Sequence, residues 1–199
     1  MATIGLSKPF VAAYAENGGT VTYSSGGVVG KLISLKMDLE GGDTNILYAD
    51  NGAAESAASF GGGTLTINTD DLSAEVMTKV LGLTKEAITG VEGLTTEDAG
   101  WYKFGDGQTV PYVGFAGIVK KMVSGSAKYV VLVYPKVQFQ NFNDAVNTQG
   151  ETIEWQTPEL TATLMRDDTA NHNWRWMSTP LATEAEAVAL IKNVFNITA

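Results

Sequence analysis

The chain of 199 residues contains no cysteine. It can therefore form no disulfide and no thiolate metal site, and it has no cysteine nucleophile. It has a single histidine, His172, which excludes a multi-histidine metal site and most histidine-dependent catalysis. No G-x-S-x-G sequence is present to form a serine nucleophile elbow. We therefore expect His172 to be solvated or to cap a turn, and we do not expect an enzyme.

Long apolar runs and an excess of positive charge are also missing. No segment approaches 18 consecutive apolar residues, and residues 1–19 contain no apolar run of signal-peptide length. The 13 basic and 22 acidic residues give a formal net charge of −9, the wrong sign for neutralising nucleic-acid phosphates. We expect a soluble protein without a membrane segment or export signal. Its acidic surface would repel the phosphates of DNA, so a duplex could pass the protein without binding to it.

Alternation with a period of two residues is the main pattern that the sequence does contain. The stretch KLISLKMDLE, residues 31–40, predicts a strand whose apolar residues at odd positions 33 to 39 share the buried face. The stretch GTLTINT, residues 63–69, predicts a second strand with Leu65 and Ile67 inside. These patterns predict a mainly β protein.

Two hairpins and one bent strand are predicted. TVTYSSGGVV, residues 20–29, predicts a hairpin that turns at residues 24–27. A second predicted hairpin, residues 110–142, turns at residues 124–126. Its arms are apolar on both faces, so either a helix or another copy of the protein must cover the second face.

The stretch ETIEWQTPELTATLMRDD contains a change of register. Ile153 and Trp155 occupy odd positions, whereas the apolar residues from Leu160 onward occupy even ones. One extra residue reverses the faces of a strand, and proline is tolerated at bulges and edges, so we predict a bulge or kink near Pro158. A long bent strand of this kind suits a barrel-like sandwich.

Two helices are predicted. Thr183 and Glu186 form a T-x-x-E capping box, followed by apolar residues at helical spacing, which predicts a C-terminal helix over residues 183–196. A short internal helix is predicted over residues 70–82, with acids at its start, an apolar stripe of Leu72, Val76 and Val80, and Gly82 as its end. No linker or internal repeat interrupts the chain, so residues 1–199 are predicted to form one domain.

Acidic pairs and aromatic residues are the remaining candidates for chemistry. Asp70–Asp71 and Asp167–Asp168 could serve as acid and base or as metal ligands, but adjacent residues on a strand face opposite ways, so capping and turn roles are expected. Four aromatic side chains could stack on sugars or bases, although packing in a core or interface is the expected role. These are Tyr102, Trp155, Trp174 and Trp176.

The stretch NILYADNGAAES, residues 45–56, lies between glycine-rich segments. It lacks the ligand spacing of an EF-hand, and the nearby GGGT lacks the lysine of a phosphate-binding loop. Neither a metal nor a cofactor is expected here. We predict that residues 41–62 form a polar connection between two strands.

Several extended stretches, taken together and in order, resemble a known family. They are MATIGLSKPFVAAY, LYADNGAAES with GGGTLTINTDDLS, PYVGFAGIVKKM through YVVLVYPKVQF, QGETIEWQTPELTATLMRDDTA and TEAEAVALIKNV. The chain resembles the major tail tube proteins of long, non-contractile bacteriophage tails, in the group typical of phages of Gram-positive bacteria. The resemblance covers nearly the whole chain and is weakest over residues 83–108 and 171–180.

The resemblance implies a two-sheet β-sandwich or barrel with a flanking helix, assembled into hexameric rings that stack into the tube through which the genome passes. A long loop or hairpin reaches the neighbouring ring in such proteins. The implied partners are further copies of the chain, a tape-measure protein, tail terminator and distal tail proteins, and double-stranded DNA in transit without tight binding. The implied location is the virion tail, assembled in the host cytoplasm, and no cofactor is implied.

Residues 41–62 are accordingly predicted to contact an adjacent subunit. The candidate contact residues are Tyr48, Asp50, Asn51 and Glu55. Two alternatives remain open at this stage. One is a carbohydrate-binding β-sandwich module that uses the tryptophans, and the other is an unusual hydrolase that uses His172.

Overall fold

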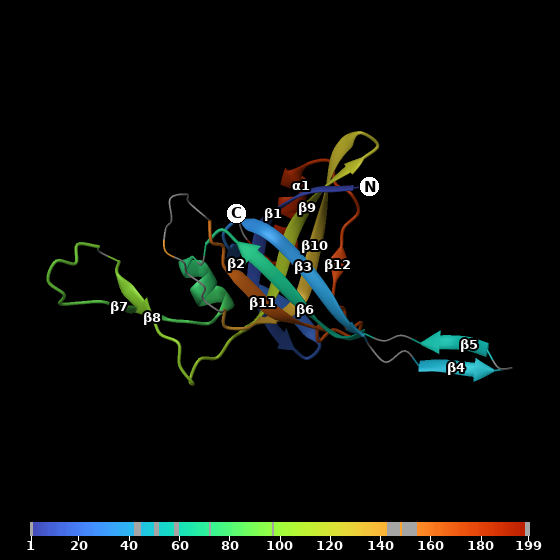
Figure 1. Ribbon diagram of the computed structural model, residues 1–199, viewed down its shortest axis with the longest axis horizontal. Coiled ribbons are helices and arrows are strands. Elements are labelled where there is room, and N and C mark those ends of the chain that lie inside the picture. Colours follow the sequence, from blue (N-terminus) through green and yellow to red (C-terminus); the bar gives the residue numbers. More distant parts are fainter. Residues whose placement is uncertain are drawn as a thin grey trace.

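A computed structural model describes residues 2–41, 45–49, 52–57, 60–71, 73–96, 98–142, 148 and 155–197. The chain is mainly β, with antiparallel strands, one α-helix near the C-terminus and one short internal helix (Figure 1). The predicted fold class is confirmed.

One curled antiparallel sheet forms the body of the molecule. Its order is β2-β1-β9-β10-β11-β6-β3, and β12 pairs with β10. The strands are β1 (Ala2–Asn17), β2 (Thr20–Val28), β3 (Leu32–Gly41), β6 (Phe60–Thr69), β9 (Tyr112–Val123), β10 (Ser126–Phe139), β11 (Glu159–Met165) and β12 (Trp176–Met177). Two hairpins lie outside this sheet, β4 (Asn45–Ala49) with β5 (Gly52–Ala57) and β7 (Lys85–Ala87) with β8 (Gly100–Tyr102).

The concave side of the sheet encloses the larger of two hydrophobic cores, which we call the inner core. Val11 of β1 and Phe115 of β9 meet Leu65 of β6 and Leu164 of β11 there, so the two layers of the sandwich are halves of one continuous sheet. The short helix η1 (Val76–Val80) adds its two terminal valines to the same core. Leu65 and Ile67 are fully buried, as their alternation predicts.

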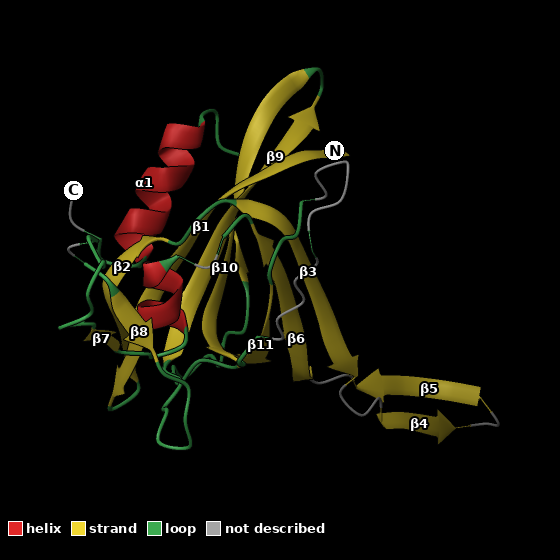
Figure 2. Ribbon diagram, turned by 60° about the vertical axis from the view of Figure 1, so that its left-hand side comes forward, coloured by secondary structure: helices red, strands yellow, loops and turns green. Residues whose placement is uncertain are grey.

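The outer face of β1, β9 and β10 is covered by helix α1 (Glu184–Val194), as Figure 2 shows. Ile191 and Phe195 pack against Ile118 of β9 and Val133 of β10, and we call this cluster the outer core. Apolar residues on both faces of β9 and β10 are thus explained by the protein's own helix. The predicted hairpin turn between these strands is confirmed, since β9 ends at Val123 and β10 begins at Ser126.

The N-terminus of α1 has the predicted capping box. The Glu186 amide donates to Oγ1 of Thr183 at 3.2 Å, and the Thr183 amide donates to Oε2 of Glu186 at 3.2 Å. The helix therefore begins where its local sequence specifies, because each partner satisfies a backbone donor that has no acceptor within the helix.

The predicted hairpin turn at residues 24–27 is wrong. β2 runs unbroken through these residues, and the chain turns instead at Gly18 and Gly19, which have φ values of 59° and 80°. The β1–β2 register shifts between Val11 and Ala13, opposite this stretch, and Ser25 has a φ of 52°. The serine and glycine residues therefore form a β-bulge, which needs the same backbone freedom as a turn.

The predicted buried face of β3 is correct only in its middle. Leu35 and Met37 pack on the inner core, whereas Ile33 and Leu39 are about half exposed, at 51% and 49%. The register with β6 shifts between Leu32 and Ser34, so Leu32 takes the buried position that the alternation gave to Ile33.

The predicted long bent strand through Pro158 is also wrong over the described residues. Residues 155–158 form no strand, β11 begins at Glu159, and Ile153 lies outside the described residues. The strand starts directly after the proline, which has no amide hydrogen to donate. The carbonyl of Pro158 still accepts from the Thr69 amide at 3.3 Å.

The internal helix is shorter than predicted and is partly of the π type. It begins at residue 74, Val76 and Val80 are buried as predicted, and Leu72 lies outside the described residues. Gly82 follows with a φ of 68°, so the predicted end is confirmed.

Asp70 does not cap this helix. Its Oδ1 accepts from the Lys31 amide at 2.8 Å, and this hydrogen bond holds the β2–β3 connection. That amide hydrogen bond is the main cause that lowers the pKa of Asp70.

Candidate assembly surfaces

The predicted connection between two strands contains a hairpin of its own. β4 and β5 pair antiparallel with each other, and Gly41 of β3 pairs with Phe60 of β6 where the connection leaves the main sheet. Figures 1 and 2 show this hairpin extending away from the body of the molecule. We call residues 45–57 the arm. An isolated two-stranded hairpin is at best marginally stable in water, so the arm calls for a further partner.

The structure brings two of the four predicted contact residues into the arm. Tyr48 lies in β4, where it pairs with Ala53, and Glu55 lies in β5, where it pairs with Leu47. Asp50 and Asn51 lie outside the described residues. Residues 37–78 contain no lysine or arginine, so every charged residue in and around the arm is acidic.

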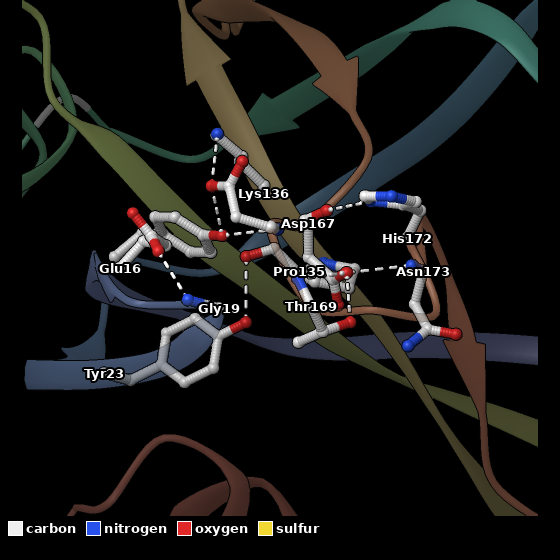
Figure 3. A network of polar contacts seen from close by, with 11 residues as sticks. Glu16, Gly19, Tyr23, Pro135, Lys136, Asp167, Thr169, His172 and Asn173 are labelled. Atoms are coloured by element: carbon white, nitrogen blue, oxygen red, sulfur yellow. Dashed lines mark hydrogen bonds and ion pairs between the residues drawn. The ribbon is translucent and has the colours of Figure 1, made fainter.

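A polar network joins β1, β10 and the turn after β11. The Tyr14 hydroxyl donates to Oδ2 of Asp168 at 2.7 Å, and Nζ of Lys136 lies 2.6 Å from the same oxygen. Lys136 is mostly buried and lies over the rings of Tyr14 and Tyr112 at 5.2 and 4.8 Å. Figure 3 shows Lys136 beside this turn. The ammonium of Lys136 and the Tyr14 hydroxyl lower the pKa of Asp168, while burial and the Asp168 carboxylate raise the pKa of Tyr14.

Asp167 organises the turn itself (Figure 3). It is 2% exposed, and its Oδ1 accepts from the Thr169 hydroxyl at 2.6 Å and the Asn173 amide at 2.8 Å. The carbonyl of Asp167 lies 3.3 Å from Nδ1 of His172, whose φ is 49°. The second acidic pair and the histidine therefore occupy a turn, the structural role that was expected for each. Within the described part of the chain, no group of three metal-ligating side chains occurs.

Residues 83–108, to which the sequence pattern assigned no structure, carry the β7–β8 hairpin. Figure 1 places this hairpin at the end of the molecule opposite the arm. Trp101 is 61% exposed, and Val91, Leu94 and Phe104 are exposed as well. Exposed apolar side chains so close in sequence are typical of a contact surface. A tryptophan in a glycine-rich, otherwise polar segment was the signal that sequence reasoning could have used.

Three of the four singled-out aromatic residues pack inside the chain. Trp174 stacks on Phe60 with ring centroids 4.9 Å apart, Trp176 packs on the outer core, and Tyr102 packs on the inner core. Trp155 is 87% exposed. The predicted packing role is therefore confirmed for three residues, and Trp155 projects into solvent.

A cleft lies between β1 and β3, where the curl of the sheet brings these two strands together. β1 and β3 are in contact, but no ladder joins them among the described strands. The cleft has a volume of about 340 Å³, and its walls include the apolar side chains of Leu6, Leu35 and Met37 and the cations Lys121 and Arg175. We call it the seam cleft.

Comparison with known proteins adds no assignment. A scan against models of protein families finds no match, and a search of curated proteins finds no similar sequence. Among the described residues, no helix is long and apolar enough to cross a membrane.

Proposed function

We propose that this chain is a structural virion protein that assembles into stacked hexameric rings, which form the tail tube of a long, non-contractile phage tail. The tube is the conduit for genome delivery. The proposal starts from the extended stretches of sequence that resemble tail tube proteins. The single structural observation that carries it is the arm, which extends away from its own domain.

The arm supports assembly because its backbone lies apart from the main sheet of its own chain. Its two strands pair only with each other in the described sheets, and they lie away from the main sheet (Figure 2). A hairpin of this kind gains stability when it packs on another surface. In a homopolymer that surface belongs to a second copy, and a head-to-tail contact of this type closes a ring or continues along an axis.

The edges of the main sheet support lateral assembly. β2 and β3 are the end strands of the sheet order, so each has one edge without a partner in the described sheets. Open edges tend to pair with other chains, and a closed ring of subunits removes that hazard by covering them. In the proposed assembly, contacts at these edges close a ring of six.

The charge of the chain suits a conduit for DNA. With a formal net charge of −9, the protein repels phosphates and gives passing DNA little to bind. The proposed partners are further copies of the chain, a tape-measure protein, tail terminator and distal tail proteins, and DNA in transit. The proposed location is the virion tail, after assembly in the host cytoplasm.

A carbohydrate-binding module remains the alternative prediction, and Trp155 is the observation that favours it. Its ring is exposed, whereas one face of Trp174 is stacked on Phe60. Binding on a glycan array that is lost in Trp155→Ala would support the alternative. Tubes formed by the same variant would support the tail tube proposal.

Deleting residues 46–58 tests the role of the arm. Because the arm extends away from the body of the molecule (Figures 1 and 2), the shortened chain is expected to keep its fold and its cooperative thermal unfolding. It is expected to stay monomeric in sedimentation velocity under conditions in which the intact chain polymerises. Normal tubes formed by the shortened chain would contradict the proposal that the arm makes the subunit contact.

A further inference from the structure

We propose that the seam cleft is the acceptor for the arm of a neighbouring copy, with Lys121 and Arg175 facing the carboxylates of that arm. This inference rests on the proposed function in one respect, that the partner is a second copy of the chain. It adds the surface on which the arm binds and the charges that select it.

The two cations of the seam cleft, Lys121 and Arg175, form no ion pair with another described residue. Nε of Arg175 is buried and has no hydrogen-bond partner in the part of the chain that the structure describes. Neither Arg175 nor Lys121 takes part in any ion pair between described residues. A buried guanidinium nitrogen without an acceptor is costly, and a carboxylate is the acceptor whose geometry fits a guanidinium best.

The arm has the complementary chemistry. Its acids are Asp50 and Glu55, with Asp43 just before it, and no lysine or arginine occurs between Lys36 and Lys79. It also contains Ile46, Leu47 and Tyr48 in sequence, an apolar stretch that suits the apolar part of the seam cleft. Such a combination gives both burial of apolar surface and charge selection.

The geometry requires the arm of another copy. The seam cleft lies beside the middle of β3, at Leu35 and Met37, whereas the arm follows the end of β3 at Gly41. In Figures 1 and 2 the arm leads outward from that end and away from the body of the molecule. The arm therefore extends away from the seam cleft of its own chain, and the contact must form between subunits.

Charge reversal tests the inference through complementation. A cleft variant carries Lys121→Glu and Arg175→Glu, and an arm variant carries Asp50→Lys and Glu55→Lys. Each variant alone places like charges opposite one another, so each is expected to need about tenfold or more protein to associate, the effect of losing one good charged contact. A 1:1 mixture, or one chain with all four substitutions, is expected to recover association, because every contact is again between opposite charges.

Sedimentation velocity over a range of concentrations measures association, and circular dichroism melting verifies that each variant is folded. Lys192→Glu, in the last turn of α1, is the control that makes the same change in charge as each single cleft substitution. If Arg175→Glu impairs folding, Lys121→Glu alone with the arm variant makes the same test without changing the buried Nε of Arg175.

The outcomes separate this inference from the proposed function. Tubes from both variants at wild-type concentrations would overturn the seam cleft as acceptor and leave the tail tube proposal standing. Association that follows the charge complementation, but yields compact oligomers without tubes, would support the seam cleft and count against a tail tube. A wild-type chain that is strictly monomeric in all conditions would overturn both.

Discussion

Gly114 of β9 lies at a crowded point of the outer core. A Cβ atom at this position would lie 2.6 Å from Cε1 of Tyr23 and 2.8 Å from Cε1 of Phe195. We expect Gly114→Ala to lower the free energy of unfolding by about 1–3 kcal/mol, because two buried rings must move to admit the methyl group. Chemical denaturation measures the change.

Gly117, three residues along the same strand, is the matched control. A Cβ there would meet its nearest neighbour, Cδ2 of Leu32, at 3.4 Å, which is an ordinary contact. Gly117→Ala is therefore expected to be tolerated. Equal destabilisation by both substitutions would show that the effect comes from β9 in general and not from Tyr23 and Phe195.

The carboxylate of Asp168 makes stability depend on pH. Its pKa is lowered in the folded chain by Lys136 and Tyr14, so its contribution is complete above the unfolded value of about 4 and is lost as the pH falls through the folded value. We expect Asp168→Asn to remove part of the acid sensitivity below about pH 4. The side chain of Asp168 is 41% exposed, so solvent screening limits the effect at neutral pH to about 1 kcal/mol or less.

Denaturation midpoints between pH 2.5 and 7 measure this dependence. Tyr14→Phe removes one of the two donors to Oδ2 of Asp168 and retains Lys136, so an intermediate acid sensitivity is expected. Identical pH profiles for wild type and Asp168→Asn would contradict the assignment.

At the scale of single residues, sequence reasoning found roles but not partners. Adjacent acids at the end of an apolar stretch indicated a turn for Asp167 and Asp168. Tyr14, however, is 154 residues from Asp168 in sequence, and Lys136 is 32 residues away. No local pattern encodes such contacts, because they exist only once β1, β10 and the turn after β11 are assembled.

Thr183 provides the clearest prediction at the scale of an element. Thr183→Ala removes the acceptor for the Glu186 amide at the start of α1, and such a loss costs about 1 kcal/mol. Because Ile191 and Phe195 of the same segment close the outer core, the loss is expected to appear in global unfolding by denaturant. Thr183→Ser retains the hydroxyl and is expected to unfold like wild type; a loss as large as that of Thr183→Ala would exclude the cap as the cause.

Elements with local signals were predicted correctly, and those shaped by their neighbours were not. The capping box of α1 and the Ser124–Gly125 turn each depend on a few adjacent residues. The stretch at residues 24–27 has the composition of a turn, but β1 continues to pair on both sides of it and converts it into a bulge. The same limit applies at Ile33, where a shift in register with β6 reverses the expected face.

At the scale of the whole molecule, the alternation predicted a mainly β chain but not how its layers connect. The two-faced pattern of β9 and β10 left two possible covers for the outer face, and α1 is the one observed. The curl of a single sheet into both layers depends on pairing between β10 and β11, and the paired residues of these two strands lie far apart in sequence. The β4–β5 and β7–β8 hairpins project at opposite ends of the molecule (Figure 1), and no periodic pattern in the sequence predicted this arrangement.

The end strands of the main sheet and the arm are the features that support the proposed assembly. Among the described strands, the main sheet ends at β2 and β3, each with one edge that has no strand partner, and the arm extends away from the body (Figure 2). Strand edges without partners carry a hazard of aggregation unless they are covered. In the proposed tube, each becomes a contact between copies.

Negative-stain electron microscopy of the purified, concentrated chain tests this central claim most directly. We expect rings or tubes of one uniform diameter, with six subunits around each ring in averaged end views. A chain that stays strictly monomeric at high concentration under all salt conditions would contradict it.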